Sequence, residues 1–175
     1  MATTSIGTQT SGAASAPYQV SIETAGLFTL LLGAWVGIVA FVGPAFSFSA
    51  DGTASWTWNL AHSLLFLVPG AVAFVAGLMI IVEGLSVGPA RRTVLGVAGF
   101  LVAVCGAWIV VGPFAWAVLE STNFFVAGGS ALRELAYWIG YSIGPGGLLL
   151  ALGAYVLGRP RAGAPKQTIW STDVP

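Results

Sequence analysis

Four long segments without charged residues constrain this chain more than any other feature. They cover about residues 25–46, 59–82, 94–119 and 137–158, and none contains Asp, Glu, Lys or Arg. Each reaches the roughly 20 residues that a helix needs to cross the hydrocarbon layer of a bilayer. The sequence therefore predicts an all-α membrane protein with four transmembrane helices.

The composition excludes the common soluble classes. Hydrophobic residues make up 57% of the 175 residues and charged residues only 7%, against about 25% charged in ordinary globular chains. The six Lys and Arg are balanced by six acidic residues, so no nucleic-acid partner is expected. The expected surroundings are a lipid bilayer and other membrane-protein subunits, or a second copy of the chain.

The segments between and beyond the spans define the organisation. Residues 1–24 are predicted to form a disordered N-terminal tail, and residues 159–175 a basic, polar C-terminal tail. Between them lie a first two-helix unit at 25–82, a cytoplasmic loop at 83–93 and a second two-helix unit at 94–158.

Positive residues predict the orientation in the membrane, because they concentrate in cytoplasmic loops. With four crossings, five of the six fall on one face, and Arg133 alone falls on the other. We therefore expect a multi-pass protein of the inner membrane with both termini in the cytoplasm. The residues on the cytoplasmic face are Arg91, Arg92, Arg159, Arg161 and Lys166.

The two units are similar in sequence, which indicates an internal repeat. The first span carries Gly33-Ala34-Trp35 and then Gly43-Pro44, and the third carries Gly106-Ala107-Trp108 and then Gly112-Pro113. The spacing from Trp to Pro is nine residues in the first copy and five in the second.

The second and fourth spans match in the same way. Pro69-Gly70 is followed seven residues later by Gly77, and Pro145-Gly146 seven residues later by Gly153. Because each unit crosses twice, the sequence predicts two parallel two-helix repeats related by an axis along the membrane normal.

At these residues the chain resembles the SPW-repeat family of bacterial integral membrane proteins, over about residues 27–82 and 95–157. The motif positions read Gly43-Pro44-Ala45 and Gly112-Pro113-Phe114, so the proline of the family's Ser-Pro-Trp is retained and the other two residues are not. The resemblance implies a four-helix membrane protein and brings no catalytic residues.

Prolines predict helix kinks, because proline removes a backbone donor and clashes with the carbonyl four residues earlier. Pro69 and Pro145 fall near mid-membrane, where a freed carbonyl either binds a ligand, as in transporters, or is satisfied by a neighbouring side chain or water. The predicted kinks are at Pro44, Pro69, Pro113 and Pro145.

Four residues are candidates for binding a cofactor or ligand. His62 is a ligand to a haem or pigment, a protonatable group facing a partner, or an interfacial histidine bonded to a loop carbonyl or to lipid headgroups. Trp35 and Trp108 either line a central pocket for a lipid, quinone or carotenoid, or pack between helices, and Tyr141 also lies within a span. Without a second His, Cys or Met at a useful spacing we expect no metal and no cofactor.

Small residues at four-residue spacing predict close helix packing, inside the chain or between subunits. The predicted strips are Gly33 with Gly37, Gly140 with Gly144, and Gly99 with Ala103 and Ala107.

The sequence holds no nucleophile–base constellation, phosphate-binding glycine loop or metal-ligand cluster, so we expect no enzyme and no catalytic residues. The pattern favours a non-catalytic structural or accessory subunit of a larger membrane assembly. The alternative is a binder or carrier of a hydrophobic small molecule held between the repeats. A channel or transporter is a weaker alternative, because the spans lack the charged groups that ion pathways use.

Overall fold

The structure is a computed structural model that describes residues 21–49, 51–86, 90–120 and 130–159. Within these ranges every regular element is helical. Four helical segments are long and apolar enough to cross a membrane, which confirms the predicted all-helical fold with four spans. They are Ile22–Phe46, Leu60–Leu85, Arg91–Glu120 and Ala131–Gly158.

The first span consists of α1, Ile22–Val42, and a 3₁₀ turn η1, Gly43–Phe46. Helix α1 begins three residues before the predicted start, because the Ser21 side chain caps it by accepting a hydrogen bond from the backbone N–H of Thr24. The tails were predicted at 1–24 and 159–175; residues 22–24 instead belong to α1, and residues 1–20 and 160–175 lie outside the described residues.

The second and fourth spans share an unusual construction. Each begins as a short α-helix, passes through a π-helical turn in which hydrogen bonds join residues five apart, and continues as a longer α-helix. The second span is α2 Leu60–His62, η2 Ser63–Leu67 and α3 Val68–Leu85. The fourth span is α5 Ala131–Tyr137, η3 Trp138–Ile143 and α6 Gly144–Gly158.

The third span is one continuous helix, α4, Arg91–Glu120, and it passes through Pro113 without ending. Because α3 runs to Leu85 and α4 begins at Arg91, the connection between them is shorter than the loop predicted at 83–93.

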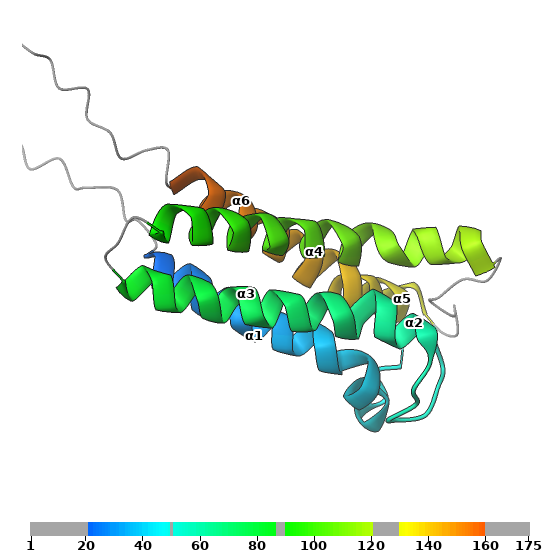
Figure 1. The fold of residues 1–175 in the computed structure, drawn as a ribbon. Helices are drawn as coiled ribbons and strands as arrows, with labels where there is room; N and C mark the ends of the chain where they lie inside the picture. Colours follow the sequence, from blue (N-terminus) through cyan, green and yellow to red (C-terminus); the bar gives the residue numbers. More distant parts are fainter. Residues whose placement is uncertain (1–20, 50, 87–89, 121–129, 160–175) are drawn as a thin grey trace, which may run out of the picture.

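The four spans lie side by side (Figure 1), with the start of α1, the end of α3, the start of α4 and the end of α6 at one end of the bundle. The opposite end carries α2, α5 and the long connection from η1 to α2. We call this opposite end the loop end.

Glycines set how closely the helices approach. A Cβ on Gly33 of α1 would collide with the backbone nitrogen of Phe74 in α3. A Cβ on Gly106 of α4 would lie 2.5 Å from the backbone nitrogen of Leu150 in α6. Helices α1 and α3, and likewise α4 and α6, therefore pack backbone against backbone at these glycines.

A second backbone contact of the same kind lies about one helical turn away in each helix pair. A Cβ on Gly77 would lie 2.5 Å from the Leu30 nitrogen, and one on Gly153 would lie 2.5 Å from the Ala103 nitrogen. The packing of α1 against α3 therefore has the same register as the packing of α4 against α6.

Of the predicted strip at Gly140 and Gly144, Gly140 lies inside the π-turn η3 and Gly144 is the first residue of α6. Gly140 packs on the ring of Phe48, whereas the nearest neighbour of Gly144 is the Ile139 carbonyl of its own turn.

Substituting Gly106 by Ala should destabilise the bundle by about 1–3 kcal/mol, the usual effect of overpacking. The reason is that the added methyl group meets backbone atoms, which cannot rotate away. The measurement is the unfolding free energy of the purified protein in mild detergent. Gly96→Ala is the matched control on the same helix, because an added Cβ there has nothing within 4 Å. Equal losses in both variants would contradict the close α4–α6 contact.

Candidate functional site

At the loop end, His62 makes a hydrogen bond with each of its ring nitrogens. Nε2 lies 2.7 Å from Oδ2 of Asp51, and Nδ1 lies 2.8 Å from the carbonyl oxygen of Thr57. The ring is 1% exposed. The sequence analysis allowed a bond to a loop carbonyl, and the structure adds the carboxylate.

Asp51 is held by a second set of donors. Its Oδ1 accepts from the backbone N–H of Thr53 at 3.2 Å, from the Thr53 hydroxyl at 2.8 Å and from the Ser49 hydroxyl at 3.4 Å. Partial burial acts to raise the pKa of Asp51, but the hydrogen bonds from His62 and Thr53 outweigh it and lower the pKa from 3.8 to about 2. Asp51 is therefore a carboxylate at neutral pH.

This geometry fixes the protonation state of His62. A carboxylate and a backbone carbonyl only accept hydrogen bonds, so both ring nitrogens must donate. Only the imidazolium has two N–H groups. His62 and Asp51 therefore form a buried, charge-assisted ion pair.

The same connection is fastened to the end of α1. The backbone N–H of Trp56 donates to the Phe41 carbonyl at 3.0 Å, with Trp56 in the left-handed region at φ 62°. The Phe41 ring contacts Trp58 at 4.8 Å and His62 edge-on at 5.5 Å between ring centroids. Together with the ion pair, these contacts hold the connection between η1 and α2 against the helix ends.

The His62–Asp51 ion pair is a structural contact that holds the connection between η1 and α2 in place. Neither nitrogen of His62 offers a lone pair to haem or pigment iron or magnesium while both donate protons, and the buried ring offers no face to a substrate. Among the described residues no group of three or more His, Cys, Asp or Glu side chains is placed to hold a metal ion.

The structure also shows what satisfies the carbonyls beside the mid-membrane prolines. In the π-turn η2, the N–H of Val68 bonds to the Ser63 carbonyl five residues earlier. In that register the Leu64 carbonyl would bond to residue 69, which is a proline and has no N–H. The indole N–H of Trp108, on α4, donates to this carbonyl at 2.9 Å.

The fourth span has the same arrangement. Here the proline belongs to the α4–α6 pair, and the tryptophan that supplies the missing donor belongs to the α1–α3 pair. In η3 the N–H of Gly144 bonds to the Ile139 carbonyl, so the Gly140 carbonyl is the one left by Pro145. The indole N–H of Trp35, on α1, donates to it at 3.0 Å. Each tryptophan thus closes the gap left by the proline of the other helix pair.

Pro113 has a third partner of this kind. In α4 the proline leaves the Ile109 carbonyl without its intrahelical donor. The buried hydroxyl of Ser142, in η3, donates to this carbonyl at 2.8 Å. Side chains of neighbouring helices therefore satisfy the backbone at all three positions.

Tyr141 is buried beside the α1 end, and its hydroxyl donates to the Phe48 carbonyl at 2.5 Å and lies 3.3 Å from the Val39 carbonyl. It joins η3 to the segment that follows η1. Like the two tryptophans, it is bonded to backbone.

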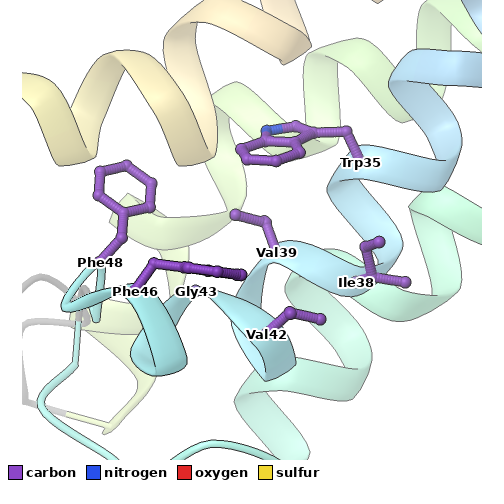
Figure 2. A pocket seen from close by; sticks show the side chains of 7 residues that line it. All are labelled: Trp35, Ile38, Val39, Val42, Gly43, Phe46 and Phe48. Atoms are coloured by element: carbon purple, nitrogen blue, oxygen red, sulfur yellow. The ribbon is translucent and has the colours of Figure 1, made fainter.

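Trp35 and Trp108 are 47% and 44% exposed, and each indole N–H is bonded to a backbone carbonyl of the other helix pair. A pocket of about 420 Å³ does lie beside Trp35 at the loop end of α1. Figure 2 shows aromatic rings from α1, η1 and the following segment gathered around Val39. The lining residues are Trp35, Ile38, Val39, Val42, Gly43, Phe46 and Phe48.

Sequence reasoning missed Asp51. Its signal was present: Asp51 is the only acidic residue between the first and second spans, and His62 is the only histidine of the chain. It was overlooked because the two are 11 residues apart on different elements, and only the folded connection brings them together.

No protein-family model, curated protein or solved structure matches this chain.

Trp108→Phe should lower the unfolding free energy by about 1 kcal/mol beyond its loss of packing, because it leaves the Leu64 carbonyl unsatisfied in hydrocarbon. Pro69→Ala restores an N–H at residue 69, so Trp108→Phe should cost about 1 kcal/mol less in that background. The control is Pro145→Ala, because the carbonyl left by Pro145 is bonded by Trp35 instead. The effects of Pro145→Ala and Trp108→Phe on the unfolding free energy should therefore be additive. Coupling of equal size to both prolines would refute the pairing.

Asp51→Asn should remove a stabilising charge whose effect depends on pH. Because the folded pKa of about 2 lies below the unfolded value of 3.8, the carboxylate stabilises the fold above pH 3.8, and the benefit disappears as pH falls towards 2. We expect a loss of about 1–2 kcal/mol at neutral pH, allowing for solvent screening, that shrinks in this acid range.

The measurement is the unfolding free energy in detergent between pH 2 and 7. Glu120→Gln, at an exposed position, serves as the control. An Asp51→Asn deficit that is independent of pH would argue against the ion pair.

Proposed function

We propose that this protein is a non-catalytic structural or accessory subunit of a larger assembly in the inner membrane. The observation that supports the proposal most strongly is a row of small residues on the outward face of α6. This row consists of Gly147, Ala151, Ala154 and Gly158, and we call it the α6 strip.

The α6 strip has the spacing of a single helix face, with intervals of four, three and four residues. All four residues are exposed, and a Cβ added to Gly147 or Gly158 has nothing within 4 Å. In membranes, such strips let two helices approach to backbone distance, which gains dispersion contacts that lipid tails do not supply.

The α6 strip differs from the glycines at the contacts within the bundle. Gly33, Gly77, Gly106 and Gly153 each meet the backbone of a neighbouring helix of the same chain. The motif that holds this bundle together thus occurs once more on its surface. A helix of another subunit, or of a second copy, is the partner that this surface suits.

The proposed orientation places both termini in the cytoplasm. Arg91 at the start of α4 and Arg159 after α6 belong to the bundle end that carries the start of α1, whereas Arg133 lies in α5 at the loop end (Figure 1). This distribution supports a cytoplasmic location for the first end. Arg161 and Lys166 lie outside the described residues.

The proposal includes an internal duplication. The backbone contacts of Gly33 and Gly77 correspond to those of Gly106 and Gly153 in partner type and spacing, and the two indole–carbonyl bonds are exchanged between the helix pairs. Both observations support two parallel copies of a two-helix unit, in keeping with the resemblance to the SPW-repeat family.

Purification from native membrane in mild detergent tests the proposed role. We expect the protein to elute with a partner in fixed stoichiometry, identified by mass spectrometry. Ala151→Leu should abolish the association, because a large side chain in the middle of the α6 strip prevents close approach. Ala107→Leu is the control, since Ala107 is exposed on α4. Elution of the native protein alone as a monomer would rule out the subunit role.

A further inference from the structure

The pocket beside Trp35 has features that the proposed structural role does not require. Its seven lining residues are all apolar or glycine, and it lies along the last two turns of α1 and on η1, within the first membrane span. Its volume of about 420 Å³ falls in the range of about 300–1,000 Å³ typical of small-molecule sites.

The pocket is formed by a change of chain direction. Helix α1 ends at Val42, η1 follows, and Ser47 adopts a left-handed conformation with φ 59°. This turn brings Phe46 and Phe48 back beside Trp35 and Val39, as Figure 2 shows.

The matching helix does not form such a turn. The glycine contacts place Gly33 of α1 in register with Gly106 of α4, so Ile38 corresponds to Val111 and Phe46 to Leu119. Helix α4 remains regular as far as Glu120, so its equivalent of Phe46 continues along the helix. The described part of the second hairpin therefore lacks the segment that closes the pocket.

The lining also indicates which part of a ligand fits. The one polar atom among the lining side chains, the indole nitrogen of Trp35, already donates to the Gly140 carbonyl at 3.0 Å. The site thus offers hydrocarbon contact and no hydrogen bond to a headgroup. Three lining residues, Trp35, Ile38 and Phe46, are 47%, 51% and 77% exposed, so the pocket opens at the bundle surface, where acyl chains of a bilayer can reach it.

We propose that this pocket binds one acyl chain of a membrane phospholipid from the leaflet at the loop end. The lipid is held through its acyl chain, because the lining offers hydrocarbon contact alone. The site differs from the position between the helix pairs considered in the sequence analysis, and it does not depend on the proposed subunit role.

The test is lipid retention by the full-length protein. The protein is reconstituted in vesicles of phosphatidylethanolamine and phosphatidylglycerol, extracted in mild detergent and examined by native mass spectrometry. We expect one phospholipid to remain bound to most wild-type molecules after detergent washing. Ile38→Trp should fill the pocket and weaken retention about tenfold or more.

Val111→Trp is the matched control, because Val111 is in register with Ile38 and is 56% exposed, against 51% for Ile38. It should retain the lipid as wild type does. Val42→Phe is a smaller change in the same pocket and should also lose lipid. It keeps the test decisive if Ile38→Trp does not fold. The unfolding midpoint of each variant reports whether it is folded.

Three results would overturn the proposal. One is equal retention in the wild type and in both folded pocket variants. The second is equal loss in Val111→Trp, which would indicate unspecific lipid around the bundle. The third is a retained isoprenoid or quinone in protein from native membrane that phospholipid does not displace.

Discussion

The requirement that every backbone polar group in hydrocarbon be hydrogen-bonded governs this bundle. A proline in a membrane helix leaves a carbonyl without its donor, and no water is at hand to replace it. Here the replacement comes from a neighbouring helix: Trp108 for the carbonyl left by Pro69, and Trp35 for that left by Pro145. Positions that would be weak points in an isolated helix thereby become connections between the helix pairs.

Close packing and hydrogen bonding depend on each other in this arrangement. Backbone contact at Gly33 and Gly106 makes each helix pair compact, and the indole groups then join one pair to the other. At the loop end, charged groups are likewise buried only where hydrogen bonds satisfy them. Burial of the His62 ring is tolerated because both of its N–H groups and both oxygens of Asp51 are hydrogen-bonded within the cluster. The bundle therefore combines an apolar interior with a few fully bonded polar groups.

The spans could be predicted from sequence because hydrophobic length is a one-dimensional property of the chain. The start of the fourth span was less accessible, because α5 contains Arg133 and Glu134 yet continues directly into η3. The tryptophan partners and the His62–Asp51 pair could not be predicted from the sequence. Backbone carbonyls carry no residue signature, and pairing across 11 or more residues depends on how the connection folds.

The two hairpins depart from symmetry where their first helices meet a proline. Ser142, three residues before Pro145, donates to the Ile109 carbonyl, and α4 continues through Pro113. In the register set by the glycine contacts, Ile109 corresponds to Val36, whereas Pro44 frees the Ala40 carbonyl about one turn further along α1. Helix α1, which meets its proline at Pro44, ends at Val42 and turns into η1. The turn that carries Phe46 and Phe48, and with it the pocket, therefore belongs to the hairpin in which the first helix ends beside its proline.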